Sequence, residues 1–155
     1  MARSLENSQY SSETVSETQS IASKLSQCLK PGSVVVFLGD LGAGKTTFIK
    51  RLIQEIALLP EDDVQSPTFT YLHIFEGKTP IYHFDLYRLK TLEDFCALGF
   101  DEYLETPDGI CLIEWPGVIQ SILPKDTFYI QIAYLSETAR QITITQNDEN
   151  EILKV

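Results

Sequence analysis

The sequence predicts an α/β fold with three layers and a mixed parallel/antiparallel central sheet. The run VVVFL at 34–38 is continuous and β-branched, which is typical of a strand buried on both faces of a parallel sheet. A glycine-rich turn and an amphipathic helical pattern follow it directly. Two further pairs of segments, 66–75 with 81–87 and 127–135 with 140–146, have the composition and alternation of strands.

The N-terminal part predicts one helix. Residues up to about 12 are expected to be frayed. Ser16 and Gln19 have the spacing of a capping box, in which two side chains satisfy the free N–H groups at a helix start. The helix would end at Lys30, where a Pro-Gly pair follows. Its apolar residues fall on one face: Ile21, Leu25, Cys28 and Leu29.

Further elements follow the glycine-rich turn in order. A helix is expected at 47–59, where apolar residues recur at helical spacing. The turn at 76–79 would join its flanking strands as a hairpin, which adds antiparallel pairing to the sheet. Thr91 is a suitable N-cap for a short helix within 91–100. The segment GICLIE at 109–114 predicts another buried strand.

Length and charge limit the classes of function. A chain of 155 residues fits a single domain, here 1–155. Lys and Arg number 12 against 22 Asp and Glu, and the net charge of -10 repels a phosphate backbone, so unaided nucleic-acid binding is not expected. Because the sequence has neither a secretory signal pattern nor 18 consecutive apolar residues, we expect a cytoplasmic protein without a membrane span.

Cysteine and histidine do not have the spacing of a metal site. Cys28, Cys96 and Cys111 lie far apart and form no C-x-x-C pair. A lone cysteine in an apolar stretch such as ICLIE is typically a small core residue. His73 and His83 lie in alternating stretches without metal-ligand spacing. A metal cage built from protein ligands alone is therefore not predicted.

Residues 39–47, GDLGAGKTT, have the full pattern of a phosphate-binding loop between a strand and a helix. The glycines allow successive backbone N–H groups to point at phosphate oxygens, and the helix that begins there adds its positive dipole end. Lys45 supplies a charge to the β- and γ-phosphates, and the Thr46 hydroxyl is a suitable ligand for Mg²⁺. The sequence therefore predicts a P-loop NTPase-like fold that binds a nucleotide with magnesium.

Three further positions are candidates for the same chemistry. A P-loop site needs an acid at the end of a neighbouring strand, and both Asp85 and Glu114 end apolar strand patterns. The sequence leaves open which of the two contacts Mg²⁺ directly. Thr68, in SPTFT, is either part of an ordinary edge strand or a switch-like sensor of the γ-phosphate. Trp115, just after Glu114, is a candidate for packing, for gating the site or for contact with a partner.

Sequence elements narrow the class of nucleotide-binding protein. The N-K-x-D and D-x-x-G elements of GTPases do not occur, so a GTP switch is disfavoured. A small-molecule kinase remains the alternative, with Asp85 as the base, although it usually carries a lid with several arginines. Of the four arginines in the chain, only Arg88 follows a candidate site residue closely. A third hypothesis is a nucleotide-gated binding module in which hydrolysis is incidental.

Four motifs, GDLGAGKTT, SPTFTY, HFDLYRL and LIEWP, resemble in order and spacing those of the TsaE (YjeE) family of bacterial P-loop ATPases. The resemblance implies a weak, partner-stimulated ATPase. It would assist formation of threonylcarbamoyladenosine at position 37 of ANN-decoding tRNAs, together with the TsaD transferase subunit and its companion TsaB. An acidic chain fits contact with tRNA only indirectly, through such protein partners.

The resemblance also implies roles for single residues. Thr46 and Glu114 would hold Mg²⁺, Asp85 would serve hydrolysis together with Lys45, Thr68 would match the switch-like threonine, and Trp115 the tryptophan beside the acid. The family often has a polar or acidic residue after EWP, where this chain has Gly117. ATP would be bound by the phosphate loop: Asp40, Leu41, Gly42, Ala43, Gly44, Lys45, Thr46 and Thr47.

Overall fold

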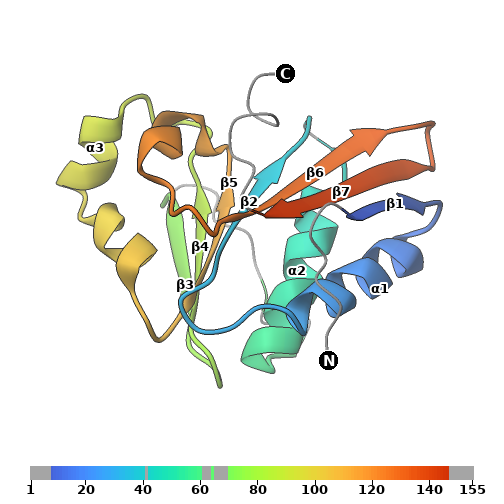
Figure 1. The fold of residues 1–155 in the computed structure, drawn as a ribbon, viewed down its shortest axis with the longest axis horizontal. Coiled ribbons are helices and arrows are strands. Elements are labelled where there is room, and N and C mark those ends of the chain that lie inside the picture. Colours follow the sequence, from blue (N-terminus) through green and yellow to red (C-terminus); the bar gives the residue numbers. More distant parts are fainter. Residues whose placement is uncertain (1–7, 41, 61–63, 65–69, 147–155) are drawn as a thin grey trace.

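The computed structural model describes residues 8–40, 42–60, 64 and 70–146. The described residues form a seven-stranded sheet with the strand order β1-β7-β6-β2-β5-β4-β3 (Figure 1). The strands are β1 (Ser8–Ser12), β2 (Val34–Leu38), β3 (Leu72–Phe75), β4 (Ile81–Asp85), β5 (Ile110–Glu114), β6 (Phe128–Tyr134) and β7 (Arg140–Gln146).

Parallel pairing is confined to the centre of the sheet. β2 pairs in parallel with both β5 and β6, and β4 pairs in parallel with β5. Two antiparallel hairpins, β6–β7 and β3–β4, flank this centre, and β1 adds an antiparallel edge to β7. The mixed central sheet predicted from the sequence is confirmed. The parallel strands bring their carboxyl ends to one edge of the sheet, where the site lies.

Helices cover both faces of the sheet, which confirms the three layers. α1 (Val15–Ser26) and α2 (Lys45–Ala57) lie side by side on one face (Figure 1). The other face is covered by α3 (Leu92–Ala97) and by two 3₁₀ helices, Phe100–Glu105 and Pro116–Ile122. No helix in the described ranges has the length and apolar character needed to cross a membrane.

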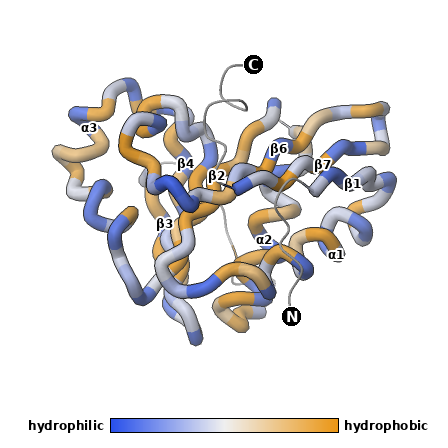
Figure 2. The backbone as a smooth tube through the Cα atoms, viewed as in Figure 1, coloured by the Kyte–Doolittle hydropathy of each residue, from blue (hydrophilic) through white to orange (hydrophobic). Residues whose placement is uncertain are grey.

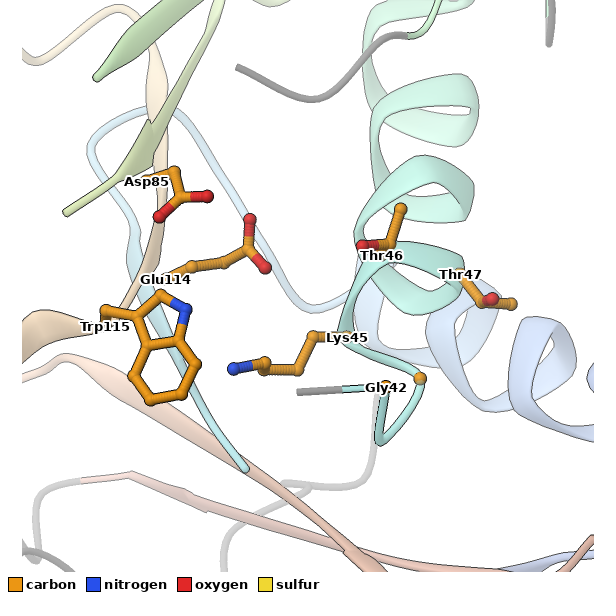
Figure 3. Close-up of a pocket in the computed structure, with 8 residues that line it drawn as sticks. Gly42, Lys45, Thr46, Thr47, Asp85, Glu114 and Trp115 are labelled. Carbon is orange, nitrogen blue, oxygen red and sulfur yellow. The ribbon is translucent and has the colours of Figure 1, made fainter. Parts of the chain in front are cut away.

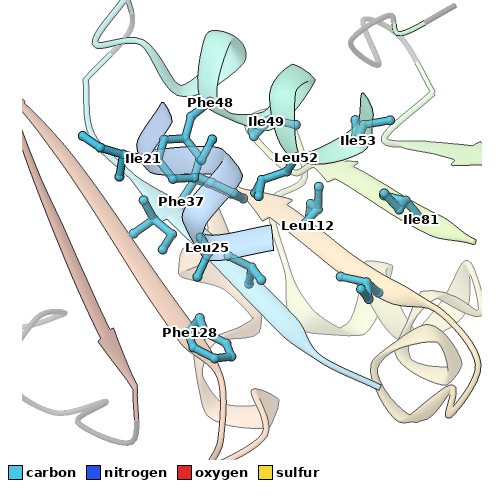
Figure 4. Close-up of a cluster of buried hydrophobic side chains, with 14 of the residues drawn as sticks. Ile21, Leu25, Phe37, Phe48, Ile49, Leu52, Ile53, Ile81, Leu112 and Phe128 are labelled. Atoms are coloured by element: carbon cyan, nitrogen blue, oxygen red, sulfur yellow. The ribbon is translucent and has the colours of Figure 1, made fainter. Parts of the chain in front are cut away.

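Each face of the sheet has its own apolar core. The core under α1 and α2 is mainly aliphatic and includes an edge-to-face pair, Phe37 with Phe48, whose ring centroids lie 5.9 Å apart (Figure 4). The core under the short helices is richer in aromatic rings, with Phe84 packed on both Phe95 and Phe100. The hydrophobic colour of the central strands in Figure 2 matches this burial on both faces.

The N-terminal prediction was wrong in two respects. Residues 8–12 are not frayed, because they pair with β7 as the edge strand β1. The capping residues of α1 are Thr14 and Glu17, each two positions before the predicted Ser16 and Gln19. The Thr14 hydroxyl accepts from the Glu17 N–H, and the Glu17 carboxylate accepts from the Glu13 N–H. The polar composition of β1 hid a strand that is held by backbone hydrogen bonds at the sheet edge.

Most other element predictions differ from the structure only at their ends. The helix expected at 47–59 begins at Lys45, and the strand expected at 81–87 ends at Asp85. Thr91 caps α3 as predicted, accepting a hydrogen bond from the Asp94 N–H. The hairpin of β3 and β4 is confirmed, although β3 begins only at Leu72. Leu41, Thr68 and the predicted strand start at 66–69 lie outside the described residues.

Candidate functional site

A pocket of about 310 Å³ opens at the carboxyl edge of β2, β4 and β5. The phosphate loop and the first turn of α2 form one wall, and the ends of β4 and β5 form the other (Figure 3). The lining residues are Gly42, Gly44, Lys45, Thr46, Thr47, Asp85, Glu114 and Trp115. The pocket therefore joins the glycine loop to both strand-end acids that the sequence singled out.

The phosphate loop turns sharply between β2 and α2. The Ala43 N–H donates to the Asp40 carbonyl at 3.1 Å, which closes the turn. Gly44 then starts the helix with φ of 108°, a left-handed conformation that a side chain disfavours. The Phe48 N–H donates to the Gly44 carbonyl at 3.1 Å, so the helical ladder begins there. A glycine is thus required at the point where loop becomes helix.

The N-terminus of α2 differs from those of the other two helices. Thr14 and Thr91 cap α1 and α3, and each of those helices has an acid in its first turn. α2 has neither a side-chain cap nor an acid in its first turn. The first N–H groups of a helix have no intrahelical partner, and the helix dipole places positive charge beside them. The first turn of α2 is therefore open to an anion in the pocket.

Lys45 is almost fully buried, with 5% of its surface exposed. Its ammonium donates to the Gly39 carbonyl at 2.7 Å and lies 3.6 Å from the centre of the Trp115 ring. Burial lowers the pKa of Lys45, while the nearby carboxylates of Glu114, Asp85 and Asp40 act in the opposite direction. The pocket thus holds a desolvated cation that faces both acids.

The two strand-end acids are direct neighbours in the sheet. Asp85 and Glu114 are paired in the parallel register of β4 and β5. Burial raises the pKa of Asp85, and a hydrogen bond from the Tyr87 N–H to its Oδ1 at 3.1 Å partly opposes that shift. Glu114 is the more buried of the two. In Figure 3 the Thr46 hydroxyl points across the pocket toward these carboxylates.

Glu114 is held by a residue that the sequence analysis did not select. His83 is 1% exposed, and its Nε2 lies 3.0 Å from Glu114 Oε2. An ionised carboxylate only accepts hydrogen bonds, so the imidazole donates through Nε2. His83 Nδ1 has no partner within the described part of the chain. His83 lies two residues before Asp85 on β4, so both side chains are on the same face of that strand, and Asp85 is paired with Glu114. This spacing was the available sequence signal.

Trp115 connects the acid side of the pocket to the loop side. Its backbone is left-handed, with φ of 56°, just where β5 ends and the 3₁₀ helix from Pro116 begins. Its ring lies over the Lys45 ammonium on one side and makes an edge-to-face contact with Tyr87 on another, with centroids 5.0 Å apart. The tryptophan therefore packs inside the site, and Tyr87 beside it is 59% exposed.

The β6–β7 hairpin supports the loop from the side opposite the acids. A Cβ on Gly39 would lie 2.5 Å from the Ile132 carbonyl, and a Cβ on Gly42 would lie 2.9 Å from the Tyr134 hydroxyl. Arg140 also reaches the loop, where its Nε donates to the Ala43 carbonyl at 3.1 Å. Gly39 is thus needed for close packing, whereas Gly42 is needed mainly for its left-handed backbone, with φ of 79°. Arg140 is the second site neighbour that the sequence analysis passed over.

The donor set fits a hard divalent cation bound together with phosphates. Carboxylate and hydroxyl oxygens are the ligands that Mg²⁺ prefers, and Asp85, Glu114 and Thr46 supply them around one pocket. Within the described residues no group of three or more His, Cys, Asp or Glu side chains is arranged to hold a metal. A cation here would thus complete its coordination with ligand or water oxygens. Cys111 is buried in the core, as its apolar stretch predicts.

The comparisons with known proteins all point to the same family. Residues 12–142 match the family model described as threonylcarbamoyl adenosine biosynthesis protein TsaE. The chain is 38% identical to the tRNA threonylcarbamoyladenosine biosynthesis protein TsaE of Treponema pallidum, over 86% of this chain and 96% of that protein. It is 39% identical to the Bacillus subtilis protein of the same name, over 83% and 79% of the two chains.

A solved structure extends this likeness to three dimensions. The crystal structure of YdiB from Bacillus subtilis superposes with a TM-score of 0.72 at 32% sequence identity, and it covers 92% of this chain and 86% of the other. The family-model match at 12–142 includes the phosphate loop, both acids and Trp115. With the family model spanning most of the sequence and relatives above 30% identity, the chain belongs to the TsaE family.

Proposed function

We propose that the chain is an ATP-binding and weakly ATP-hydrolysing accessory protein, required for threonylcarbamoyladenosine modification at position 37 of ANN-decoding tRNAs. One observation carries the proposal. Lys45, Thr46, Asp85 and Glu114 meet around one pocket at the open N-terminus of α2. Membership of a family named for threonylcarbamoyladenosine biosynthesis in tRNA supports the biological role.

The phosphates of ATP would be bound by the loop and the start of α2. Asp40 to Thr47 are the proposed phosphate-binding residues, and the first N–H groups of α2 have no side-chain cap that would compete with phosphate oxygens. The Lys45 ammonium, which now contacts Gly39 and Trp115, would turn toward the β- and γ-phosphates. Its low exposure strengthens the charge interaction, because little water screens it. The loop would thus provide both affinity and charge neutralisation.

The acid wall would serve metal binding and hydrolysis. The Thr46 hydroxyl and the Glu114 carboxylate are the proposed Mg²⁺ ligands, since His83 already fixes one Glu114 oxygen and orients the group. Bound Mg²⁺ would supply charge neutralisation at the β- and γ-phosphate oxygens. Asp85, whose raised pKa makes it a better base than an ordinary aspartate, would orient the attacking water and accept its proton. Thr68 stays a proposed γ-phosphate sensor.

The proposed partners are the TsaD and TsaB proteins of the threonylcarbamoyl transferase complex. A net charge of -10 disfavours direct contact with tRNA, so the nucleic acid would be reached only through those partners. The kinase alternative loses support, because Lys45 is the single cationic side chain among the described pocket residues. A lid that clamps two phosphorylated substrates needs more positive charge than that.

The test is ATP hydrolysis by the purified chain, alone and with TsaD and TsaB added. Thr46→Ala serves as the inactive variant, and Thr46→Ser, which keeps the hydroxyl, is the matched control. We expect partners to raise a low rate for the wild type and for Thr46→Ser, and to leave Thr46→Ala flat. A wild-type rate that ignores the partners would contradict the proposed accessory role. A flat wild-type rate in every mixture would contradict the ATPase activity itself.

A further inference from the structure

Arg140 is the first residue of β7, and it lies 97 positions after the loop residue that it contacts. Its Nε donates to the Ala43 carbonyl at 3.1 Å. Its Nη1 contacts three carbonyls of the β6–β7 turn, at Ser136, Glu137 and Ala139, at 3.1 to 3.2 Å. One guanidinium thereby ties the hairpin turn to the phosphate loop.

The Tyr134 ring fixes the guanidinium from one face. The centre of the Arg140 guanidinium lies 4.1 Å from the centre of that ring. The same tyrosine places its hydroxyl beside Gly42, so the hairpin meets the loop at two neighbouring residues. A planar guanidinium that is stacked and hydrogen-bonded on several atoms loses little entropy for each further bond. Arg140 is therefore a rigid anchor for the loop carbonyl.

The contact with Ala43 determines where the next amide points. In a planar trans peptide the carbonyl and the following N–H point in opposite directions. Arg140 holds the Ala43 carbonyl from outside the pocket lining, and Gly44, which carries the amide of the same peptide, lines the pocket. Gly44 has no Cβ to oppose rotation of this peptide, and its φ is 108°. The local sequence therefore leaves the peptide orientation to an external contact.

We propose that Arg140 is a positioning residue that orients the Ala43–Gly44 peptide, so that the Gly44 N–H faces a bound phosphate. This inference rests on the proposed nucleotide site. It gives the C-terminal hairpin a role in nucleotide affinity without requiring a contact between Arg140 and the nucleotide. A rotated peptide would present the Ala43 carbonyl to the phosphate and repel it.

The first measurement is ADP and ATP affinity of Arg140→Met, which keeps an unbranched side chain but removes every donor. We expect binding of both nucleotides to weaken roughly tenfold, the effect of one misdirected donor to a charged group. Arg51→Met is the matched control, because Arg51 pairs with Glu55 and donates to Ser23 of α1, and it does not line the pocket. Its affinities should stay within twofold of the wild type.

The second measurement observes the peptide itself without nucleotide. Ala43–Gly44 is the only Ala-Gly pair in the sequence, so carbonyl-¹³C alanine with ¹⁵N glycine isolates one NMR signal. Arg140→Met should shift or broaden this signal, and Arg140→Lys, which keeps a charge and a donor, should restore part of both the signal and the affinity. An unchanged signal beside weakened binding would overturn the inference in favour of plain charge attraction.

The two measurements separate this inference from the function on which it rests. Wild-type protein that binds neither ADP nor ATP would contradict the proposed function, whereas the NMR signal would still report whether Arg140 orients the peptide. Wild-type affinity in Arg140→Met would overturn the positioning role alone. If Arg140→Met does not fold, Arg140→Lys is compared with the wild type in the same two measurements. Full affinity with a displaced signal in that variant would equally overturn the role.

Discussion

The two walls of the pocket are built in different ways. The loop wall consists of consecutive residues, from Gly39 to Thr47, and its local pattern predicts its structure. The acid wall is assembled from Asp85 and Glu114, which become neighbours only through the parallel register of β4 and β5. The loop wall can therefore be predicted from one stretch of sequence. The acid wall cannot, because it depends on how distant strands pair.

The walls also differ in what holds them. The loop relies on glycines and on contacts from the β6–β7 hairpin, including the one from Arg140. The acid wall relies on the sheet and on the buried contact between His83 and Glu114. Both walls bury charge, since desolvation lowers the pKa of Lys45 and raises that of Asp85. Substitutions in the two walls should therefore affect different measured properties.

The largest expected effect comes from the loop wall, in Lys45→Met. Loss of the ammonium should reduce ATP hydrolysis by about 100-fold to 1,000-fold, as removal of a main charge-stabilising donor does. The thermal midpoint without nucleotide should change little, because the substitution loses the ammonium's contacts with Gly39 and Trp115 but also removes a desolvated charge. Hydrolysis assays and thermal unfolding check both parts. Lys50→Met, on the same helix, is the matched control and should retain wild-type hydrolysis.

An intermediate effect is expected from the acid wall, in His83→Leu. Without its hydrogen bond, Glu114 should lose its orientation, and the Mg²⁺ concentration for half-maximal hydrolysis should rise about tenfold or more. ATP affinity in EDTA should stay unchanged, because the loop wall is intact. His83→Gln, which keeps a donor, should recover part of the Mg²⁺ response. Equal losses with and without Mg²⁺ would mean that the histidine supports the fold as a whole.

The smallest expected effect concerns stability, in Asp85→Asn. A raised folded-state pKa means that protonation of Asp85 favours the fold, so its contribution is complete below the ordinary pKa of 3.8 and is lost as pH rises through the raised value. The neutral amide should therefore raise the thermal midpoint modestly at pH 7. It should give no gain below pH 3.8. Melting curves across that pH range, with no nucleotide present, measure the difference.

The sequence predicted those parts of the molecule that have strong local signals. VVVFL, the loop after it and the Thr91 cap each carry enough information within a few residues. The strand Ser8–Ser12 was missed because it is polar and depends on β7 for its hydrogen bonds. His83 and Arg140 were passed over for a related reason. Their partners, Glu114 and Ala43, are 31 and 97 positions away in the chain, so the contacts themselves depend on how distant strands pair.

The position of β2 has a consequence for the order of folding. β2 pairs only with β5 and β6 in the described sheet, and both strands are synthesised much later. The loop motif therefore leaves the ribosome long before its parent strand has neighbours, and contacts of such long range form slowly. A nascent chain that ends before residue 110 carries the complete phosphate-loop motif without either strand that pairs with β2. The proposed nucleotide binding would thus become possible only after β5 and β6 have been made, as a property of the assembled sheet.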